Sequence, residues 1–324
     1  MNSKFLDKDE SANIKGMAAL FVMLGHLFTS EYPLVAQFMS AGCLWVGLFF
    51  FYSGYGVMYS YRNNIDYMHG FILNKIFKIY IPFVIAETIY TISYIVINPD
   101  AYSVKDIIAD CLGVHLLNGS LWYVVHILLF YFLFYIIQKC THGNLNVWLW
   151  LGIFVVYLAL AVGLDIGNWW YISSFALVMG VCYLDLQKWY DILLENDMLR
   201  ILIVCGFAIS FFLLQLAKYF SFAIIPIQIT WYITFLDMVT VPFFVMFVWI
   251  FTERVHIFRG VIMKFLGKNS YEIYIYHLLV LLWLNQIENM NLWIKAILLV
   301  GITCIVAKIM NGVDKKIMGL KKRR

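Results

Sequence analysis

Five ionisable side chains lie inside long apolar stretches of the sequence, and they are the residues best placed to do chemistry. They are His26, Glu87, His126, Asp237 and His277. An ionisable group in hydrocarbon is costly, so it usually pairs with another polar group or marks a substrate or ion pathway. One such residue could simply form a hydrogen bond between two helices. Five of them in five different stretches indicate a polar interior that could support a reaction or a transport step.

The spacing of Lys15 and His26 gives the sharpest signal. They are eleven residues apart in the first apolar stretch. After eleven residues an α-helix returns to within about 20° of the same face and has risen about 16 Å, so one extended ligand could contact both. A second pair of cations, Lys75 and Lys78, lies at positions i and i+3, one turn before Pro82. Cations in such a place can equally be ordinary charges on the inner side of a membrane.

The elements that carry these residues are expected to be membrane-spanning helices. Of the 324 residues, 63% are apolar and only 13% are charged, whereas about 25% are charged in an ordinary soluble domain. Ten apolar stretches are each about long enough to cross a bilayer. They are residues 14–29, 39–61, 76–97, 121–137, 145–162, 169–184, 201–217, 229–251, 270–285 and 291–309. We therefore predict an all-α polytopic membrane protein with about ten transmembrane helices.

The positions of the positive charges predict the orientation. If the N-terminus is cytoplasmic, Lys105, Lys218 and Lys295 fall on the outer side, and every other lysine and arginine falls in a tail or connection on the inner side. Retention of positive charge on the cytoplasmic side during insertion produces this alternation. Both termini are therefore expected in the cytoplasm, with a short basic tail at about residues 310–324.

Other features argue against other kinds of protein. The formal charge of +4 is too small to indicate nucleic acid binding. The six cysteines are scattered, with no C-x-x-C pair and no spacing typical of metal ligands. We therefore expect no metal, no permanently bound cofactor and no nucleic acid partner. The expected surroundings are the lipid bilayer.

Five segments resemble, in the same order, the motifs of the acyltransferase-3 family of integral membrane O-acyltransferases. They are Ile14–Leu20 followed by Gly25 and His26, Phe49–Tyr55, Lys75–Pro82, Leu121–Tyr123 with Tyr131, and Ser270–His277. The resemblance covers nearly the whole chain. The family more often has arginine where this chain has Lys15, Lys75 and Lys78, and lysine lacks the bidentate fork of arginine.

The resemblance implies a single transmembrane acyltransferase domain over residues 1–324, in a multi-pass protein of the bacterial plasma membrane. It implies transfer of an acyl group, commonly acetyl, from a cytosolic acyl-coenzyme A (acyl-CoA) such as acetyl-CoA to a carbohydrate hydroxyl. The product would be an O-acetylated polysaccharide of the cell surface or envelope. The donor is a co-substrate, and Lys15, Lys75 and Lys78 would bind its phosphates.

His26 is the expected catalytic residue. A neutral imidazole can accept a proton near neutral pH, so His26 could act as a general base on the acceptor hydroxyl. It could equally carry the acyl group itself as an acyl-imidazole. Glu87, Asp237 and His277 are candidates to hold its ring in the required tautomer.

Eight residues are candidates for lining the substrate cavity. They are Ser53, Tyr55, Glu87, Trp122, His126, Asp237, Tyr274 and His277. Ser270, Tyr274 and His277 follow i, i+4, i+7 spacing and would share one helix face. Ser53, Gly54 and Gly56 are more typical of small residues that allow close helix contact than of a G-x-S-x-G nucleophile motif.

Two other functions fit part of this pattern. A transporter or exporter of a polysaccharide precursor would also use ten helices with buried histidine and carboxylate side chains. It needs no basic pocket for coenzyme A, so acetyl-CoA should not stabilise it. A catalytically idle scaffold of an envelope complex would tolerate the loss of every buried ionisable group.

Overall fold

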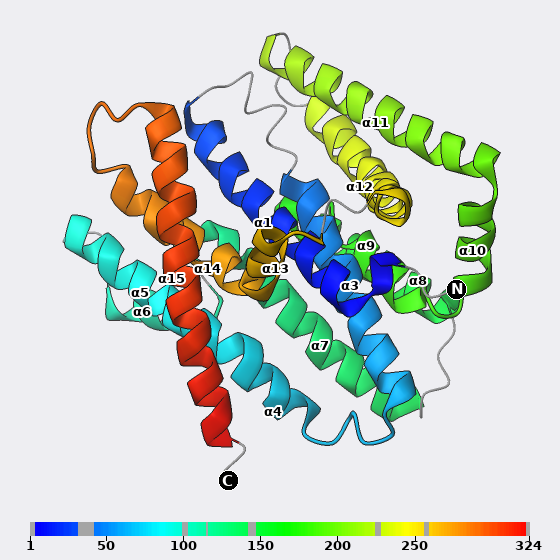
Figure 1. The fold of residues 1–324 in the computed structure, drawn as a ribbon, viewed down its shortest axis with the longest axis horizontal. Helices are drawn as coiled ribbons and strands as arrows, with labels where there is room; N and C mark the ends of the chain where they lie inside the picture. Colours follow the sequence, from blue (N-terminus) through cyan, green and yellow to red (C-terminus); the bar gives the residue numbers. More distant parts are fainter. Residues whose placement is uncertain are drawn as a thin grey trace. The chain divides into compact units, whose positions relative to one another are not determined.

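The computed structural model of the chain describes residues 4–31, 42–98, 103–114, 116–141, 147–223, 228–255 and 259–321. This part of the chain consists of helices and their connections, without a β-strand. It falls into two compact units. Unit 1 comprises Met1–Asp66 and Thr141–Gly267, and unit 2 comprises Tyr67–Cys140 and Lys268–Arg324. Figure 1 shows the helices of both units, coloured along the sequence.

Unit 1 contains the N-terminal helices and the central part of the chain. Its elements are η1 (Lys4–Leu6), α1 (Lys8–Glu31), α3 (Gly42–Asn63), α8 (Val147–Gly163), η4 (Asn168–Trp170), α9 (Phe175–Cys182), α10 (Gln187–Glu195), α11 (Asp197–Ala223), α12 (Gln228–Arg254) and α13 (Val261–Lys268). The chain bends by 106° between α9 and α10. α11 and α12 lie side by side (Figure 1).

Unit 2 contains the helices between Tyr67 and Cys140 and the two C-terminal helices. Its elements are α4 (Phe71–Lys75), η2 (Ile76–Tyr80), α5 (Ile81–Ile97), α6 (Val104–Cys111), η3 (Gly119–Leu121), α7 (Trp122–Thr141), α14 (Ser270–Leu284) and α15 (Leu292–Lys321). α14 and α15 pack against each other, and α14 also contacts α5.

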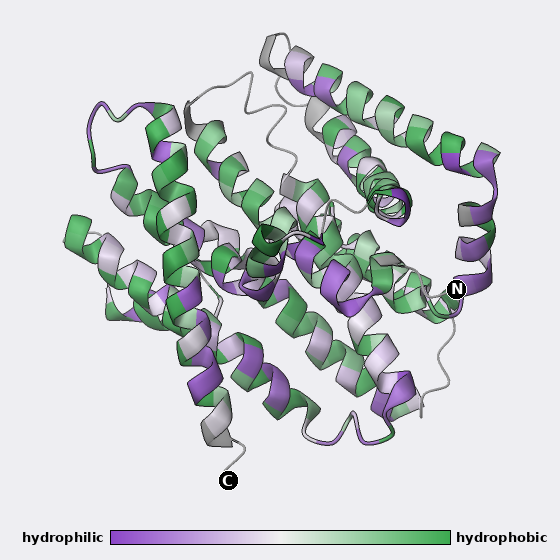
Figure 2. Ribbon diagram, viewed as in Figure 1, coloured by the Kyte–Doolittle hydropathy of each residue, from purple (hydrophilic) through white to green (hydrophobic). Residues whose placement is uncertain are grey.

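Seven segments of the described chain are long and apolar enough to cross a bilayer. They are Lys8–Phe28, Gly42–Asn63, Phe71–Ile97, Gly119–Thr141, Asp197–Tyr219, Trp231–Arg254 and Leu292–Gly319. The bent pair Asn168–Cys182 and Gln187–Leu193 gives an eighth if it is one span, and Val147–Gly163 and Ser270–Leu284 are shorter apolar helices. In Figure 2 the middle of α11 is mostly green, whereas hydrophilic residues gather on α10 and the C-terminal half of α15.

The prediction of an all-α polytopic membrane protein is confirmed, because each of the ten predicted stretches contains a helix. Residues 39–41 and 145–146 of those stretches, and residues 322–324 of the predicted basic tail, lie outside the described residues. Ten spans with both termini in the cytoplasm stay a prediction. The single domain over the whole chain also stays a prediction.

In unit 1, α3 and α9 approach each other backbone to backbone. A methyl group on Gly54 would overlap the carbonyl oxygen of Leu177, and one on Gly180 would overlap the carbonyl oxygen of Phe51. Glycine therefore lets these helices touch, as the sequence indicated for Gly54. Gly56 differs, because a methyl group there would meet no described atom within 4 Å.

In unit 2, the helix that carries Lys75 and Lys78 widens before Pro82. Residues Ile76–Tyr80 form a turn of π-helix, in which the backbone N–H of Ile81 donates to the carbonyl of Ile76. Proline lacks an N–H, and its ring clashes with the carbonyl four residues earlier in a regular α-helix. A wider turn accommodates the missing N–H and leaves room for the proline ring, so the helix continues through Pro82.

α6 folds back along α5. The Tyr80 hydroxyl donates to the carbonyl of Cys111 at 3.2 Å, and Thr88 Oγ1 lies 3.7 Å from Cys111 Sγ. Ser103 and Asp106 form a capping box that starts α6. The connection that leads to α7 therefore returns to the middle of α5, a helix expected to cross the membrane.

Candidate functional site

A cavity of about 900 Å³ opens in unit 1. Aromatic and positively charged side chains dominate its described lining. The aromatic residues are Tyr52, Tyr55, Tyr59 and Tyr183, and the cations are Lys8, Lys15 and Arg259. A volume of this size is within the usual range for small-molecule sites, in which a few polar groups fix the orientation of the ligand. The cavity can therefore hold a large ligand that combines negative charge with a flat ring.

The N-terminal segment forms one wall of this cavity and is held firmly. Phe5 is buried, and its ring centroid lies 5.0 Å from that of Tyr52 and 6.1 Å from that of Trp249. The Tyr52 hydroxyl donates to the carbonyl of Phe5 at 3.1 Å, and the Phe5 N–H donates to the Glu253 carboxylate at 3.1 Å. These contacts fix Leu6, Asp7 and Lys8, which follow Phe5 and line the cavity.

The tyrosines of the cavity come from two elements that lie next to each other. Tyr55 and Tyr59 are on α3 with ring centroids 5.6 Å apart, and Tyr183 follows α9 with its ring perpendicular to that of Tyr55 at 5.5 Å. Tyr183 also packs on Tyr190 at 4.8 Å. Tyr183 and Tyr190 are buried, Tyr55 is half-buried and Tyr59 is exposed. The packed rings offer flat surfaces to a ligand.

The cations of the cavity differ in how far their charge is neutralised. Lys15 is half-buried, and its Nζ lies 5.9 Å from the centroid of the Tyr52 ring. Arg259 forms an ion pair with Glu10, which is itself buried. Lys8 and the acidic Asp7 are exposed at the rim. The positive charge of Lys15 inside the cavity and of Lys8 at its rim makes the site suited to an anion.

Two of the residues proposed from the sequence, Lys15 and Tyr55, line this cavity together. His26 does not belong to its described lining. It lies on the same unbroken helix as Lys15, α1, about 16 Å further along the axis. His26 is exposed, while Gly25 and Leu27 beside it are buried. The stacked rings of Phe21 and Trp45, 4.3 Å apart, join α1 to α3 between these two levels.

Asp237 takes part in a separate polar cluster of unit 1. Its carboxylate accepts a hydrogen bond from the Cys43 thiol at 3.3 Å and lies 3.6 Å from Lys218 Nζ. Asp237 is buried, so the ion pair compensates a charge that would otherwise be costly. The cluster connects α3, α11 and α12. Ser53 is half-buried on α3, outside the described lining of the cavity.

Lys75 and Lys78, in unit 2, have different surroundings although they are three residues apart. Lys75 Nζ lies 3.7 Å from the centroid of the Tyr131 ring and 5.1 Å from that of Phe71, which are cation–π contacts. Lys78 lines a second pocket, of about 390 Å³, with Glu272 and Lys315. The π-helical turn between them has more residues per turn than an α-helix, so i and i+3 no longer share a face.

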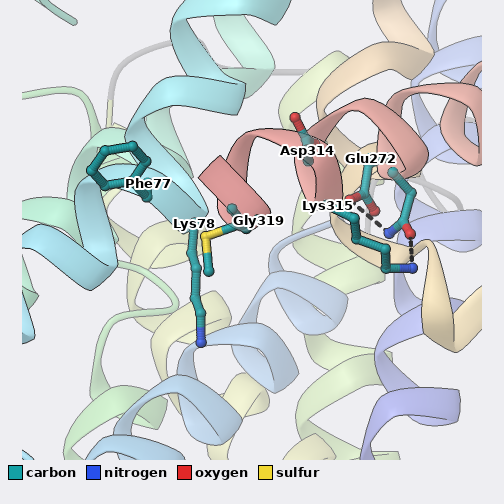
Figure 3. A pocket seen from close by; sticks show the side chains of 8 residues that line it. Phe77, Lys78, Glu272, Asp314, Lys315 and Gly319 are labelled. Carbon is teal, nitrogen blue, oxygen red and sulfur yellow. Dashed lines mark hydrogen bonds between the residues drawn. The ribbon is translucent and has the colours of Figure 1, made fainter. Parts of the chain in front are cut away.

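Figure 3 shows this second pocket. Phe77 and Lys78 reach it from one helix, and Asp314, Lys315 and Gly319 from α15. The Asn311 amide donates to Glu272 at 2.8 Å and accepts from Lys315. The lining of this pocket contains two lysines and two carboxylates, namely Lys78, Lys315, Glu272 and Asp314, so the formal charges cancel. The pocket is therefore less suited to a polyanion than the cavity of unit 1.

Glu87 and Tyr274 are buried in unit 2, where they hold the segment that precedes α7. The Glu87 carboxylate accepts from the backbone N–H of Asn118 at 3.2 Å, and the Tyr274 hydroxyl donates to the carbonyl of Ser120. The Asp110 carboxylate accepts from the N–H of Leu117 at 3.2 Å. Non-helical backbone within a membrane needs such partners.

His126 and His277 are buried in unit 2, and neighbours of each contact one another. His277 Nδ1 is 2.6 Å from the carbonyl oxygen of Tyr274. A carbonyl can only accept, so Nδ1 carries the proton and Nε2 is the basic nitrogen of the neutral ring. The ring of Trp122 lies 6.3 Å from that of His126, and the ring of Tyr123 lies 5.5 Å from that of Tyr274.

Within the described residues, no group of three or more histidine, cysteine, aspartate or glutamate side chains is placed to hold a metal ion.

A family model described as an acyltransferase domain, that of the acyltransferase-3 family, matches residues 9–311. The match covers nearly the whole chain, so the protein belongs to this family and is a membrane acyltransferase. No curated protein and no solved structure matches the chain significantly.

Sequence reasoning found only part of the cavity. Tyr52 and Tyr59 share a helix face with Tyr55, because the three lie at i, i+3 and i+7, so this stripe could have been read from the sequence. Tyr183 and Arg259 reach the cavity from other elements. No local pattern connects them with α1 or α3, and only the fold brings them there.

Proposed function

We propose that the protein transfers an acyl group, acetyl in the simplest case, from a cytosolic acyl-CoA to a hydroxyl of a cell-surface or envelope carbohydrate. The observation that carries this proposal is the cavity of unit 1, which joins cations to a cluster of tyrosines. The proposal includes the bacterial plasma membrane as its location, with this cavity open to the cytoplasm.

The chemistry of the cavity fits the nucleotide part of coenzyme A. Its phosphates suit the ammonium groups of Lys8 and Lys15, because charge-assisted hydrogen bonds are the strong ones. Its adenine ring suits the flat surfaces of Tyr55, Tyr59 and Tyr183. An acyl group carried on a plain phosphopantetheine would leave the tyrosines unused. We therefore favour acyl-CoA over an acylated carrier protein as donor.

The slender, nearly uncharged pantetheine arm would follow α1 from Lys15 toward His26. In the reaction His26 takes the proton of the acceptor hydroxyl, whose oxygen attacks the thioester carbonyl. A new ester bond forms, the carbon–sulfur bond breaks, and the proton passes to the leaving thiolate. In the second route, the imidazole attacks the thioester carbonyl, the carbon–sulfur bond breaks and coenzyme A leaves as its thiolate. The acceptor oxygen then takes the acyl group from the acyl-imidazole, and the hydroxyl proton passes to the thiolate. Lys75 and Lys78 are proposed as further donor contacts.

Donor binding to purified full-length protein in detergent tests this proposal. Acetyl-CoA should raise the melting temperature in a concentration-dependent way. Dephospho-coenzyme A should act more weakly, and pantetheine alone should have little effect. A transporter of polysaccharide precursors predicts no shift with any of the three. Mass spectrometry of envelope glycans with and without the protein then tests the acceptor, through the loss of an acetyl-sized increment.

A further inference from the structure

A groove in unit 1 lies between α11 and α12, at the end where α11 begins and α12 ends. Its volume is about 280 Å³. Arg200 and Arg254 lie at one end of the groove, and apolar side chains of Ile201, Val204 and Ile250 line the rest. None of these residues belongs to the described lining of the proposed donor cavity. The groove is therefore a separate feature.

The two arginines converge on a single carboxylate. Asp197 forms an ion pair with Arg200, and its Oδ1 lies 3.8 Å from an Nη atom of Arg254. The Asp197 side chain is 84% exposed and that of Arg254 is 62% exposed. The Arg200 side chain is 18% exposed, so its ion pair with Asp197 is partly buried. The pair of Asp197 with Arg254 is exposed and contributes little by itself. Asp197 therefore keeps the two guanidinium groups close together. The described lining of the groove contains these two cations and one anion, so the lining carries a net positive charge.

The apolar part of the groove faces outward. Ile201 is 61% exposed and Val204 is 38% exposed. Both helices are candidate membrane spans, so this surface lies against hydrocarbon just beyond the arginines. A ligand that fills the groove needs an anionic head and an apolar chain on the same molecule.

We propose that this groove binds an anionic phospholipid from the surrounding leaflet. The phosphate lies between Arg200 and Arg254, and one acyl chain lies along Ile201, Val204 and Ile250. Guanidinium forks match phosphate oxygens bidentately, which an ammonium group does not. Basic pockets between transmembrane helices are known as sites for anionic lipid headgroups. The complementary charge favours an anionic over a zwitterionic lipid.

The test measures lipid binding to the purified full-length protein in detergent by native mass spectrometry and thermal shift. The probes are phosphatidylglycerol and phosphatidylcholine with identical acyl chains, and inorganic phosphate. Phosphatidylglycerol should bind and raise the melting temperature, while the other two should not. An equal effect of phosphatidylcholine would overturn the role of charge, and an equal effect of phosphate alone would overturn the role of the acyl chain.

Three variants locate the site. Arg200→Gln with Arg254→Gln should weaken phosphatidylglycerol binding by about tenfold or more, because both charge-assisted contacts are lost. Asp197→Asn should strengthen it, because the competing carboxylate disappears. Val204→Trp keeps every charge but fills the groove, and should also weaken binding, so the proposal stays testable if the double arginine variant does not fold.

The matched control is Lys188→Gln with Lys264→Gln, which removes two exposed charges of unit 1 outside the groove. It should leave phosphatidylglycerol binding unchanged. An equal loss in this control and in the double arginine variant would show general electrostatic attraction and would overturn the proposed site.

Discussion

The cavity of unit 1 and the buried residues Glu87 and Tyr274 of unit 2 use ionisable and tyrosine side chains in opposite ways. In unit 1, Lys15 and the tyrosines line a ligand-sized volume. In unit 2, Glu87 and Tyr274 are buried, and their side chains form hydrogen bonds with backbone atoms. A buried ionisable residue in an apolar helix is therefore no sufficient sign of a reactive site, because it can equally hold a segment in place.

The largest effect is expected on acyl transfer, from His26→Ala. Loss of a general base or acyl carrier should reduce acyl transfer by about 10²–10⁴-fold, while the thermal shift by acetyl-CoA is kept, since His26 is outside the described lining of the cavity. The measurement is transfer of a radiolabelled acetyl group in membranes. Expression should match the wild type, and His69→Ala, which removes an exposed histidine without a proposed role, serves as the histidine control. Full activity of His26→Ala would remove it from the mechanism.

The second largest effect is expected on the stability of unit 2, from Glu87→Ala. Glu87→Ala leaves the buried N–H of Asn118 without its acceptor and should cost about 1–3 kcal/mol in the free energy of unfolding. Glu87→Gln keeps an acceptor oxygen at the same place and should be nearly neutral. Thermal unfolding in detergent measures both. If Glu87→Gln abolished transfer in a fully stable protein, Glu87 would belong to the active site and the comparison would fail.

A smaller effect is expected from Lys15→Gln. Removing one charge-assisted contact, worth about 1.5–3 kcal/mol, should weaken acetyl-CoA binding by roughly tenfold to a hundredfold. Isothermal titration calorimetry gives the dissociation constant. The control is Lys264→Gln, which removes an exposed charge of unit 1 outside the cavity. Equal affinity of both variants for acetyl-CoA would show that Lys15 does not bind the phosphates of the donor.

The smallest effect is expected from Lys75→Gln combined with Lys78→Gln. Lys75 forms cation–π contacts with the rings of Tyr131 and Phe71, and Lys78 lines a pocket that is also lined by Glu272. We expect donor binding to weaken by less than for Lys15→Gln, in the same calorimetric titration. A loss greater than that of Lys15→Gln would move the main anion site to unit 2.

The helices could be predicted from the sequence because each needs only a local apolar run of about 20 residues. The common face of Lys15 and His26 also follows from helix geometry alone, and α1 is unbroken between them. The close approach at Gly54 was indicated by its small neighbours.

The rest depends on contacts between distant parts of the chain. Tyr183 and Arg259 join the cavity only through the packing of α9 and α13 near α1 and α3. The return of α6 along α5 is fixed by Tyr80 and Thr88, which lie more than twenty residues away from Cys111. The π-helical turn that separates Lys75 from Lys78 also contradicts simple i, i+3 reasoning, although Pro82 gave a local reason to expect irregularity.

The most direct test of the central claim is to map where the donor binds. An acetyl-CoA analogue with a photoreactive azide on its adenine ring is crosslinked to the purified protein, and labelled peptides are identified by mass spectrometry. We predict labelling of Tyr52–Ser60 and Tyr183–Gln187, which unlabelled acetyl-CoA abolishes. Competed labelling confined to peptides of unit 2, such as those with Lys78 or Lys315, would contradict the assignment of the donor site.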